Sequence, residues 1–232
     1  DQIEETKGYL ATIIDYAIDY FKRLKSDYGK GKERKTEIKV FADVDATKVV
    51  IRNTKLYVNR EEGFVGTGMR RDEYVCDCSD IDDIIVFTKS GKMMVTKVDT
   101  KTFVGKNIIH VAVFKKKDTR TVYNMIYKDG KGGASYIKRF AVTSITRDRE
   151  YDLTTGKPQT NVLYFSANPN GEAEVVTVLL RQVGSIKKLK WDVDFSCISI
   201  KGRGTKGNIV TKHAVKRIEL KEKGVSTLKP RK

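Results

Sequence analysis

From residue 37 onward the sequence predicts an all-β fold, built as a propeller-like array of small antiparallel sheets. Short runs rich in β-branched and aromatic residues recur, and glycine-containing hairpin signals separate them. These glycines return at intervals of 28 to 41 residues, the chain has only three prolines, and no helical periodicity is visible after residue 40. A β-sandwich is the alternative, but its strands would follow at even spacings of roughly 8–12 residues without the longer period.

A helical pattern covers residues 2–26, ahead of the β region. Apolar side chains alternate at spacings of four and three, interrupted at Lys7 and widened by Ile13 and Ile18. Such a seam is typical of a long coiled-coil arm, with an ordinary amphipathic helix packed on its own domain as the alternative. The seam consists of Ile3, Leu10, Ile14, Ala17, Phe21 and Leu24.

Gly29 and Gly31 are expected to end this helix, and the charged segment after it is too polar to pack. The first residue is Asp1, inside the helical pattern, so we expect the chain to be a fragment of a longer protein. The expected parts are a coiled-coil-type helix (1–28), a charged linker (29–39), a β domain (40–222) and a basic tail (223–232).

Twelve strands are predicted within and just before the β domain. They cover residues 36–41, 48–53, 54–59, 82–88, 92–98, 107–114, 121–127, 134–142, 161–167, 173–180, 194–200 and 207–215. Dipeptides that adopt the positive φ angles of tight hairpins lie between many of these runs. These signals are Glu62-Gly63, Ser90-Gly91, Asp129-Gly130, Asn170-Gly171 and Arg203-Gly204. Five such glycines predict about five hairpin blades.

The net charge of +16 is concentrated in two blocks. Residues 101–150 carry twelve Lys and Arg against four Asp and Glu, and residues 184–232 carry fourteen against four. Residues 41–100 instead carry nine basic and eleven acidic side chains. Concentrating one sign of charge costs self-repulsion, so the two basic blocks indicate a polyanionic partner, by default nucleic acid.

Within these blocks the cations form local clusters, one of them in the glycine-rich segment 201–207. Glycine lets a phosphate approach the backbone, and no aromatic residues interleave as stacking platforms for single strands. The pattern therefore favours backbone contact with duplex DNA, with a solvated basic face as the alternative. The candidate DNA-binding residues are Lys115, Lys116, Lys117, Arg120, Lys138, Arg139, Lys187, Lys188, Lys190, Lys201, Arg203, Lys206 and Lys212.

The sequence offers no constellation for catalysis or for a metal. His110 and His213 each lie in a strand pattern without a paired acid, and Cys76 and Cys78 are too close together for a zinc knuckle. We therefore expect no catalytic residue, no metal and no cofactor in this chain. No stretch approaches 18 apolar residues, so we expect no membrane partner. Three cysteines form no disulfide framework, which favours the reducing cytoplasm.

Several long strings resemble the C-terminal domain of the A subunit of bacterial type IIA topoisomerases, most closely the topoisomerase IV type. Residues 14–38 are similar to the helix and charged linker that leave the coiled-coil arm of that subunit. Residues 56–98, 103–114, 163–176 and 200–212 resemble its blades and inter-blade loops. The resemblance implies a β-pinwheel, in which blades exchange strands. It also implies a domain that binds and bends duplex DNA and guides a segment to the strand-passage core for decatenation or relaxation.

The partners implied by the resemblance are duplex DNA, the rest of the A subunit and the ATPase B subunit. In the full-length protein the A subunit is implied to form a homodimer. The catalytic tyrosine and the sites for ATP and Mg²⁺ belong to other parts of that enzyme, so this fragment is implied to be non-catalytic. Gyrase A subunits carry a glutamine-arginine-arginine, glycine-rich box in the first blade, whereas Glu61 and Glu62 stand at the similar position here. This departure favours the topoisomerase IV type over a gyrase DNA-wrapping domain. A β-propeller scaffold that binds an acidic protein is the alternative from another class.

Overall fold

The computed structural model describes residues 2–32, 54–184 and 186–228. The chain divides into two compact units, Asp1–Val49 and Val50–Lys232. The predicted strands 36–41 and 48–53, and most of the predicted linker, lie outside the described residues. Each unit is described by itself below.

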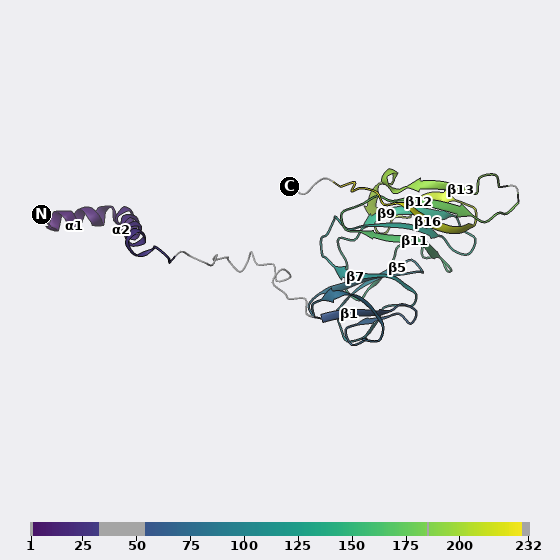
Figure 1. Cartoon of the computed structure of the whole chain (residues 1–232), viewed down its shortest axis with the longest axis horizontal. Helices are drawn as coiled ribbons and strands as arrows, with labels where there is room; N and C mark the ends of the chain where they lie inside the picture. Colours follow the sequence, from purple (N-terminus) through teal and green to yellow (C-terminus); the bar gives the residue numbers. More distant parts are fainter. Residues whose placement is uncertain (1, 33–53, 185, 229–232) are drawn as a thin grey trace. The chain divides into compact units, whose positions relative to one another are not determined.

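The N-terminal unit contains two consecutive helices, α1 (Gln2–Ala11) and α2 (Ile13–Tyr28), where the sequence predicted one (Figure 1). The break falls at Thr12, whose φ and ψ are −125° and 44°. The Thr12 hydroxyl donates to the Gly8 carbonyl at 3.2 Å, a back-bond that bends helices. Neither helix buries a residue, and the end of α2 at Tyr28 agrees with the predicted stop at Gly29. The coiled-coil pairing stays a prediction.

The second unit is all-β, and its described strands form four sheets. The first sheet has the order β3 (Glu73–Cys78), β1 (Thr54–Asn59), β2 (Phe64–Gly66) and β6 (Thr102–Phe103). The second has the order β10 (Glu150–Asp152), β5 (Lys92–Lys97), β4 (Asp83–Thr88) and β7 (Ile108–Phe114).

The third sheet is centred on two long strands that pair with each other. Its order is β11 (Asn161–Asn168), β8 (Val122–Lys128), β9 (Ser135–Ala141) and β14 (Ile200–Gly202), and β15 (Asn208–Thr211) also pairs with β9. The fourth sheet has the order β13 (Lys190–Asp194), β12 (Val175–Leu180) and β16 (Val215–Glu222). The pairing of β14 with β9 is parallel, and every other pairing between these strands is antiparallel.

Each of the first three sheets takes a strand from a later part of the chain. β6 follows the β4–β5 hairpin of the second sheet but joins the first, and β10 follows β8 and β9 but joins the second. In the same way β14 and β15 follow β12 and β13 but pair with β9. This exchange is the β-pinwheel arrangement, so the predicted all-β, propeller-like fold class is confirmed.

The five predicted hairpin glycines correspond to four sheets because they mark different kinds of turn. Gly63, Gly91 and Gly130 have φ angles of 86°, 80° and 76° and lie in the turns that join paired strands. Gly171 instead connects β11 of the third sheet to β12 of the fourth, and Gly204 lies between two strands that both pair with β9. A turn glycine by itself therefore does not report which strands pair across it.

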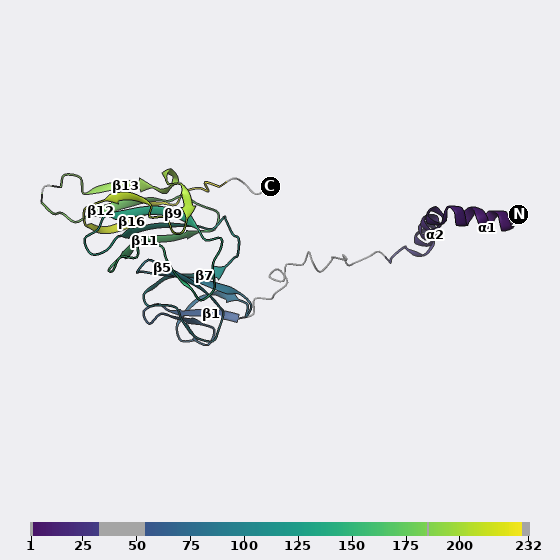
Figure 2. The ribbon, with the colours of Figure 1, turned by 180° about the vertical axis from the view of Figure 1, so that it is seen from behind.

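Three core clusters fill the spaces between successive sheets. Leu56 and Val86 belong to the cluster between the first and second sheets, Phe87 and Tyr127 to the cluster between the second and third, and Phe195 to the one between the third and fourth. Figures 1 and 2 show β1 at one end of this unit and β13 at the other. Within the described residues no core cluster joins the first sheet to the fourth, so the four sheets form an open series.

One predicted strand, 194–200, is wrong in its centre. Residues Phe195–Cys197 form a short 3₁₀ helix, and the strands β13 and β14 lie on either side of it. The Asp194 carboxylate accepts a hydrogen bond from the Ser196 amide at 2.7 Å, which caps this turn. Phe195 is buried against Tyr164, so its apolar character serves the core and not a strand.

Candidate nucleic-acid interface

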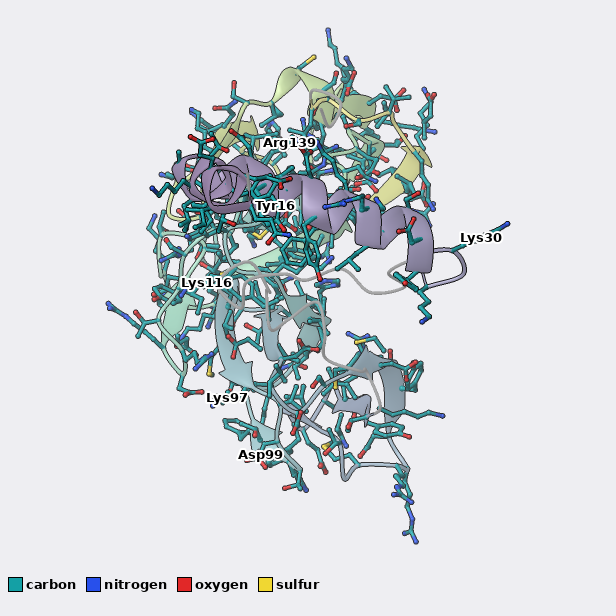
Figure 3. All side chains as sticks on the ribbon, turned by 90° about the vertical axis from the view of Figure 1, so that its left-hand side faces the viewer. Tyr16, Lys30, Lys97, Asp99, Lys116 and Arg139 are labelled. Carbon is teal, nitrogen blue, oxygen red and sulfur yellow. The ribbon has the colours of Figure 1, made fainter. Side chains whose placement is uncertain are left out.

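Lys115, Lys116 and Lys117 are exposed on the loop that joins β7 to β8. Asp118 fixes this loop, because its carboxylate accepts hydrogen bonds from the Arg120 amide at 2.8 Å and from the Thr121 hydroxyl at 2.6 Å. Burial acts to raise the pKa of Asp118, but these hydrogen bonds outweigh it and lower the pKa. Figure 3 shows Lys116 at the outer edge of the β unit. The loop therefore presents three ammonium groups to solvent.

A second loop joins β9 to β10 and carries an arginine that the sequence analysis did not single out. The Arg149 guanidinium lies 5.4 Å from the centroid of the Tyr151 ring, and the Arg203 guanidinium lies 4.2 Å from it. The Tyr151 hydroxyl accepts a hydrogen bond from the Thr146 amide at 2.8 Å. This hydrogen bond, with the charges of Arg203 and Arg149, lowers the pKa of Tyr151. Sequence spacing alone does not reveal the stacking, because Arg203 is distant in the chain.

The third loop is the glycine-rich segment that contains Arg203. A Cβ built at Gly202 or Gly204 would meet no other atom within 4 Å, and neither residue has a positive φ. Gly207 differs, because its φ is 90° and a Cβ there would lie 2.3 Å from the Ile137 carbonyl oxygen. The fold therefore requires glycine at 207 but not at 202 or 204. The open space at these two positions suits the close approach of a nucleic-acid backbone.

Two hydrogen bonds join these three loops at one end of the third sheet. The Lys117 amide donates to the Thr143 carbonyl at 3.1 Å, and the Arg203 guanidinium donates to the Ser144 carbonyl at 2.5 Å. Ala141 at the end of β9 is opposite both Val122 and Gly202. We call this surface the basic edge, formed by loops 115–120 and 143–149 and by segment 201–205, and it unites cations from both basic blocks of the sequence. Lys206 lies outside this edge, because its Nζ is 4.5 Å from the centroid of the Tyr136 ring, near the Ser135 end of β9.

Four other predicted cations gather at the opposite end of the third sheet. They belong to the β12–β13 connection, to the first residue of β13 and to the turn after β15, where Thr211 is opposite Ser135 at the start of β9. The Arg181 amide donates to the Ala214 carbonyl at 2.9 Å and joins the two segments. We call this group the second cluster, and its exposed members are Lys187, Lys188, Lys190 and Lys212. The predicted set is thus split between two surfaces.

Two residues of the predicted set do not face solvent. Lys138 and Arg139 are 2% and 1% exposed. The Lys138 ammonium donates to three backbone carbonyls, and the Arg139 guanidinium bonds to the Asn124 side chain at 3.0 Å and the Gly171 carbonyl at 3.0 Å. Arg139 lies among the packed strands in Figure 3. The predicted phosphate contacts of these two residues are therefore corrected, because both side chains are internal cations. The charge pattern of the sequence does not show that both faces of β9 are covered.

The two histidines occupy different environments. His110 packs against Phe87 and Phe165, with ring centroids 5.9 and 5.6 Å away, and burial, with a smaller contribution from Arg60, lowers its pKa to about 4. His110 is therefore neutral near pH 7, whereas His213 is exposed beside the second cluster. Among the described residues, no three His, Cys, Asp or Glu side chains gather as a metal-binding group. No described helix is long and apolar enough to span a bilayer.

Comparison with known proteins defines the class of this domain. Residues 55–223 match the family described as the topoisomerase C-terminal domain of Bacteroidota. The chain belongs to this family.

Among individual proteins, the chain is similar to the A subunit of DNA topoisomerase 4 from Borreliella burgdorferi, with 25% identity over 169 residues. The match covers 72% of this chain and 26% of that protein, so the chain spans about a quarter of the length of this relative. A crystal structure of the C-terminal domain of DNA topoisomerase IV matches 77% of this chain and 64% of its own, with a TM-score of 0.42 and 12% identity.

Proposed function

We propose that this chain is the duplex-DNA-binding and bending domain of a topoisomerase IV-type A subunit. In this role it guides a DNA segment to the strand-passage core for decatenation or relaxation. The observation that carries the proposal is the basic edge, where Lys117 and Arg203 bond to neighbouring carbonyls of one loop. A surface of exposed cations and open glycines suits the phosphates of a duplex and reads no bases. The family and the similarity to the A subunit of a topoisomerase 4 support this role.

The first sheet supports the topoisomerase IV type over a gyrase DNA-wrapping domain. Its β1–β2 turn exposes Glu61 and Glu62. The cation of this turn, Arg60, is paired with Glu73 at 2.7 Å. Carboxylates repel a phosphate backbone, so this turn is a poor starting point for tight wrapping. We therefore infer that the domain grips DNA through its third and fourth sheets.

The proposal extends to the surroundings of the domain. The chain acts without a catalytic residue or cofactor of its own, and ATP and Mg²⁺ are used elsewhere in the holoenzyme. The domain works in the cytoplasm, where its protein partners are the rest of its own A subunit and the ATPase B subunit. The full-length A subunit forms a homodimer.

The direct test is the salt dependence of duplex binding by the chain. The slope of log K against log salt is negative. Replacing Lys115, Lys116, Lys117 and Arg120 together by Gln should make this slope shallower by about 0.9 for each phosphate that is no longer neutralised. An unchanged slope would remove this loop from the interface. A wild-type chain that fails to bind duplex in ~0.1 M salt would instead support a protein-interaction scaffold.

DNA topology separates the two topoisomerase roles. Nicked minicircles bound by the chain and then closed with ligase should retain little constrained positive writhe, because the β1–β2 turn that exposes Glu61 and Glu62 does not start a wrap. Strong constrained positive writhe would show a gyrase-type wrapping domain. Replacing Glu61 and Glu62 by Arg in the same assay should increase the writhe.

A further inference from the structure

Lys138 is a buried cation whose hydrogen bonds join two separate segments of the chain. Its Nζ donates to the Leu153 carbonyl at 2.5 Å, to the Arg203 carbonyl at 2.6 Å and to the Thr205 carbonyl at 2.9 Å. Leu153 directly follows β10, whereas the other two acceptors belong to the glycine-rich segment of the basic edge. An ammonium group has three N–H donors, so all of them are used.

The two segments are those that carry the stacked pair of the basic edge. Tyr151 lies on β10, two residues before Leu153, and the Arg203 side chain lies over its ring at 4.2 Å. The carbonyl of the same Arg203 accepts the bond from Lys138. Lys138 therefore holds the backbone beneath Arg203 at a fixed place relative to Tyr151.

Packing alone gives no reason for a cation at this position. Within the part of the chain that the structure describes, no carboxylate lies within ion-pair distance of Lys138. Its Nζ lies 4.7 Å from the centroid of the Phe140 ring. A buried charge without an opposite charge is costly, and burial lowers the pKa of Lys138 to about 7. An apolar side chain of similar length would fill the space without this cost, but it would leave three carbonyls without a donor.

We propose that Lys138 is the positioning residue of the basic edge, holding segment 201–205 against Tyr151 so that Lys201 and Arg203 meet a DNA backbone together. This inference rests on the proposed DNA-binding function. Lys138 touches no DNA in this arrangement, and it acts through the loop whose carbonyls it binds. Without it the two cations remain on the chain but lose their common placement.

The test is a double-mutant cycle on duplex affinity and its salt slope, measured with the full chain and a 40-bp duplex. One variant is Lys138→Met, a second replaces Lys201 and Arg203 together by Gln, and a third combines them. Lys138→Met should make the negative salt slope shallower by up to about 1.8, the value for two phosphates that are no longer neutralised. The combined variant should bind duplex less than twofold more weakly than the variant with the neutralised loop, because the loop through which Lys138 acts has already lost its charges.

Two further variants separate placement from charge and from folding. Lys138→Arg keeps the positive charge but cannot donate to all three carbonyls in the same directions, so it should also make the slope shallower. This variant replaces Lys138→Met if the latter fails to fold. Lys97→Met removes one exposed charge from β5, outside the basic edge, and should change the slope by less than either Lys138 variant.

The outcomes distinguish the two proposals. If Lys138→Met lowers affinity by the same factor in the neutralised loop as in the wild type, Lys138 does not act through the loop and the inference is wrong. An unchanged slope in both folded Lys138 variants would also overturn it. If the neutralised loop itself binds duplex as the wild type does, the basic edge is not the DNA-binding surface, and the proposed function fails at this site.

Discussion

At the scale of residues, Lys138 and Arg139 show how the alternation of a strand gives adjacent cations different roles. Side chains of successive strand residues point to opposite faces. Lys138 bonds to the carbonyl after β10 of the second sheet, whereas Arg139 bonds to the carbonyls of Gly171 and Phe195 beside the fourth. Because both faces of β9 are packed, the two cations connect the third sheet to its two neighbours.

Removing Arg139 should destabilise the fold without a specific effect on DNA. Arg139→Met leaves the buried side-chain oxygen of Asn124 without its donor and removes the bonds to the Gly171 carbonyl and the Thr227 hydroxyl. We expect a loss of roughly 3–5 kcal/mol in the free energy of unfolding, measured by urea denaturation. Arg217→Met, at an exposed position on β16, is the control and should change it by less than about 0.5 kcal/mol. Equal effects in the two variants would contradict the role of Arg139.

The pKa of Lys138 gives a prediction for stability against pH. Its pKa is about 7 in the folded chain and 10.5 for an ordinary lysine, so between these values the unfolded state binds more protons. Stability should therefore rise with pH from about 7 toward 10, by at most about 1.4 kcal/mol per pH unit. Lys138→Met should lose this rise, as measured by urea unfolding at pH 6.5, 7.5, 8.5 and 9.5. A parallel pH profile for the two proteins would show that the pKa is not depressed.

At the scale of elements, the glycines of segment 201–207 separate a requirement of the fold from a requirement of the interface. Gly207→Ala should cost roughly 1–3 kcal/mol of stability, because its φ is 90° and its Cβ would meet a backbone oxygen. Gly202→Ala and Gly204→Ala should leave the melting temperature nearly unchanged but weaken duplex binding several-fold. Melting and binding measured on the same three variants provide the check. Unchanged binding in the latter two would show that DNA does not approach this backbone.

The N-terminal helices show where pattern and local chemistry differ. The alternating seam predicted one helix, and it located the helical region and its end correctly. The break falls at Thr12, whose hydroxyl bonds to the Gly8 carbonyl, although Thr6 makes the same kind of bond to Gln2 inside the unbroken α1. The apolar spacing contains no information about this break.

At the scale of the whole molecule, the predicted cations occupy two surfaces, and DNA that follows both must cross the third sheet. The basic edge lies at the Ala141 end of β9 and the second cluster at the Ser135 end. Neutralising Lys187, Lys188, Lys190 and Lys212 should make the salt slope shallower in addition to the effect of neutralising the basic edge, because the two surfaces lie at opposite ends of this strand. If either set alone removed the whole slope, DNA would be held at one surface. Salt titrations of the two variants and their combination give the result.

The amino-acid sequence alone predicts the fold class and the charge that indicates a nucleic-acid partner. It also predicts nine of the described strands but misses others, including β3 and β16; the nine are β1, β4, β5, β7, β8, β9, β11, β12 and β15. These properties depend on local composition and spacing: alternating β-branched runs, hairpin glycines and the excess of Lys and Arg. The exposure of each cation depends on the tertiary structure, because Lys138 and Lys116 differ in burial and not in chemistry. The tertiary structure also brought Arg149 beside Arg203 on Tyr151 and gave four sheets for five turn glycines. These outcomes depend on strands exchanged between sheets, and such long-range pairing is not encoded in any local stretch of the chain.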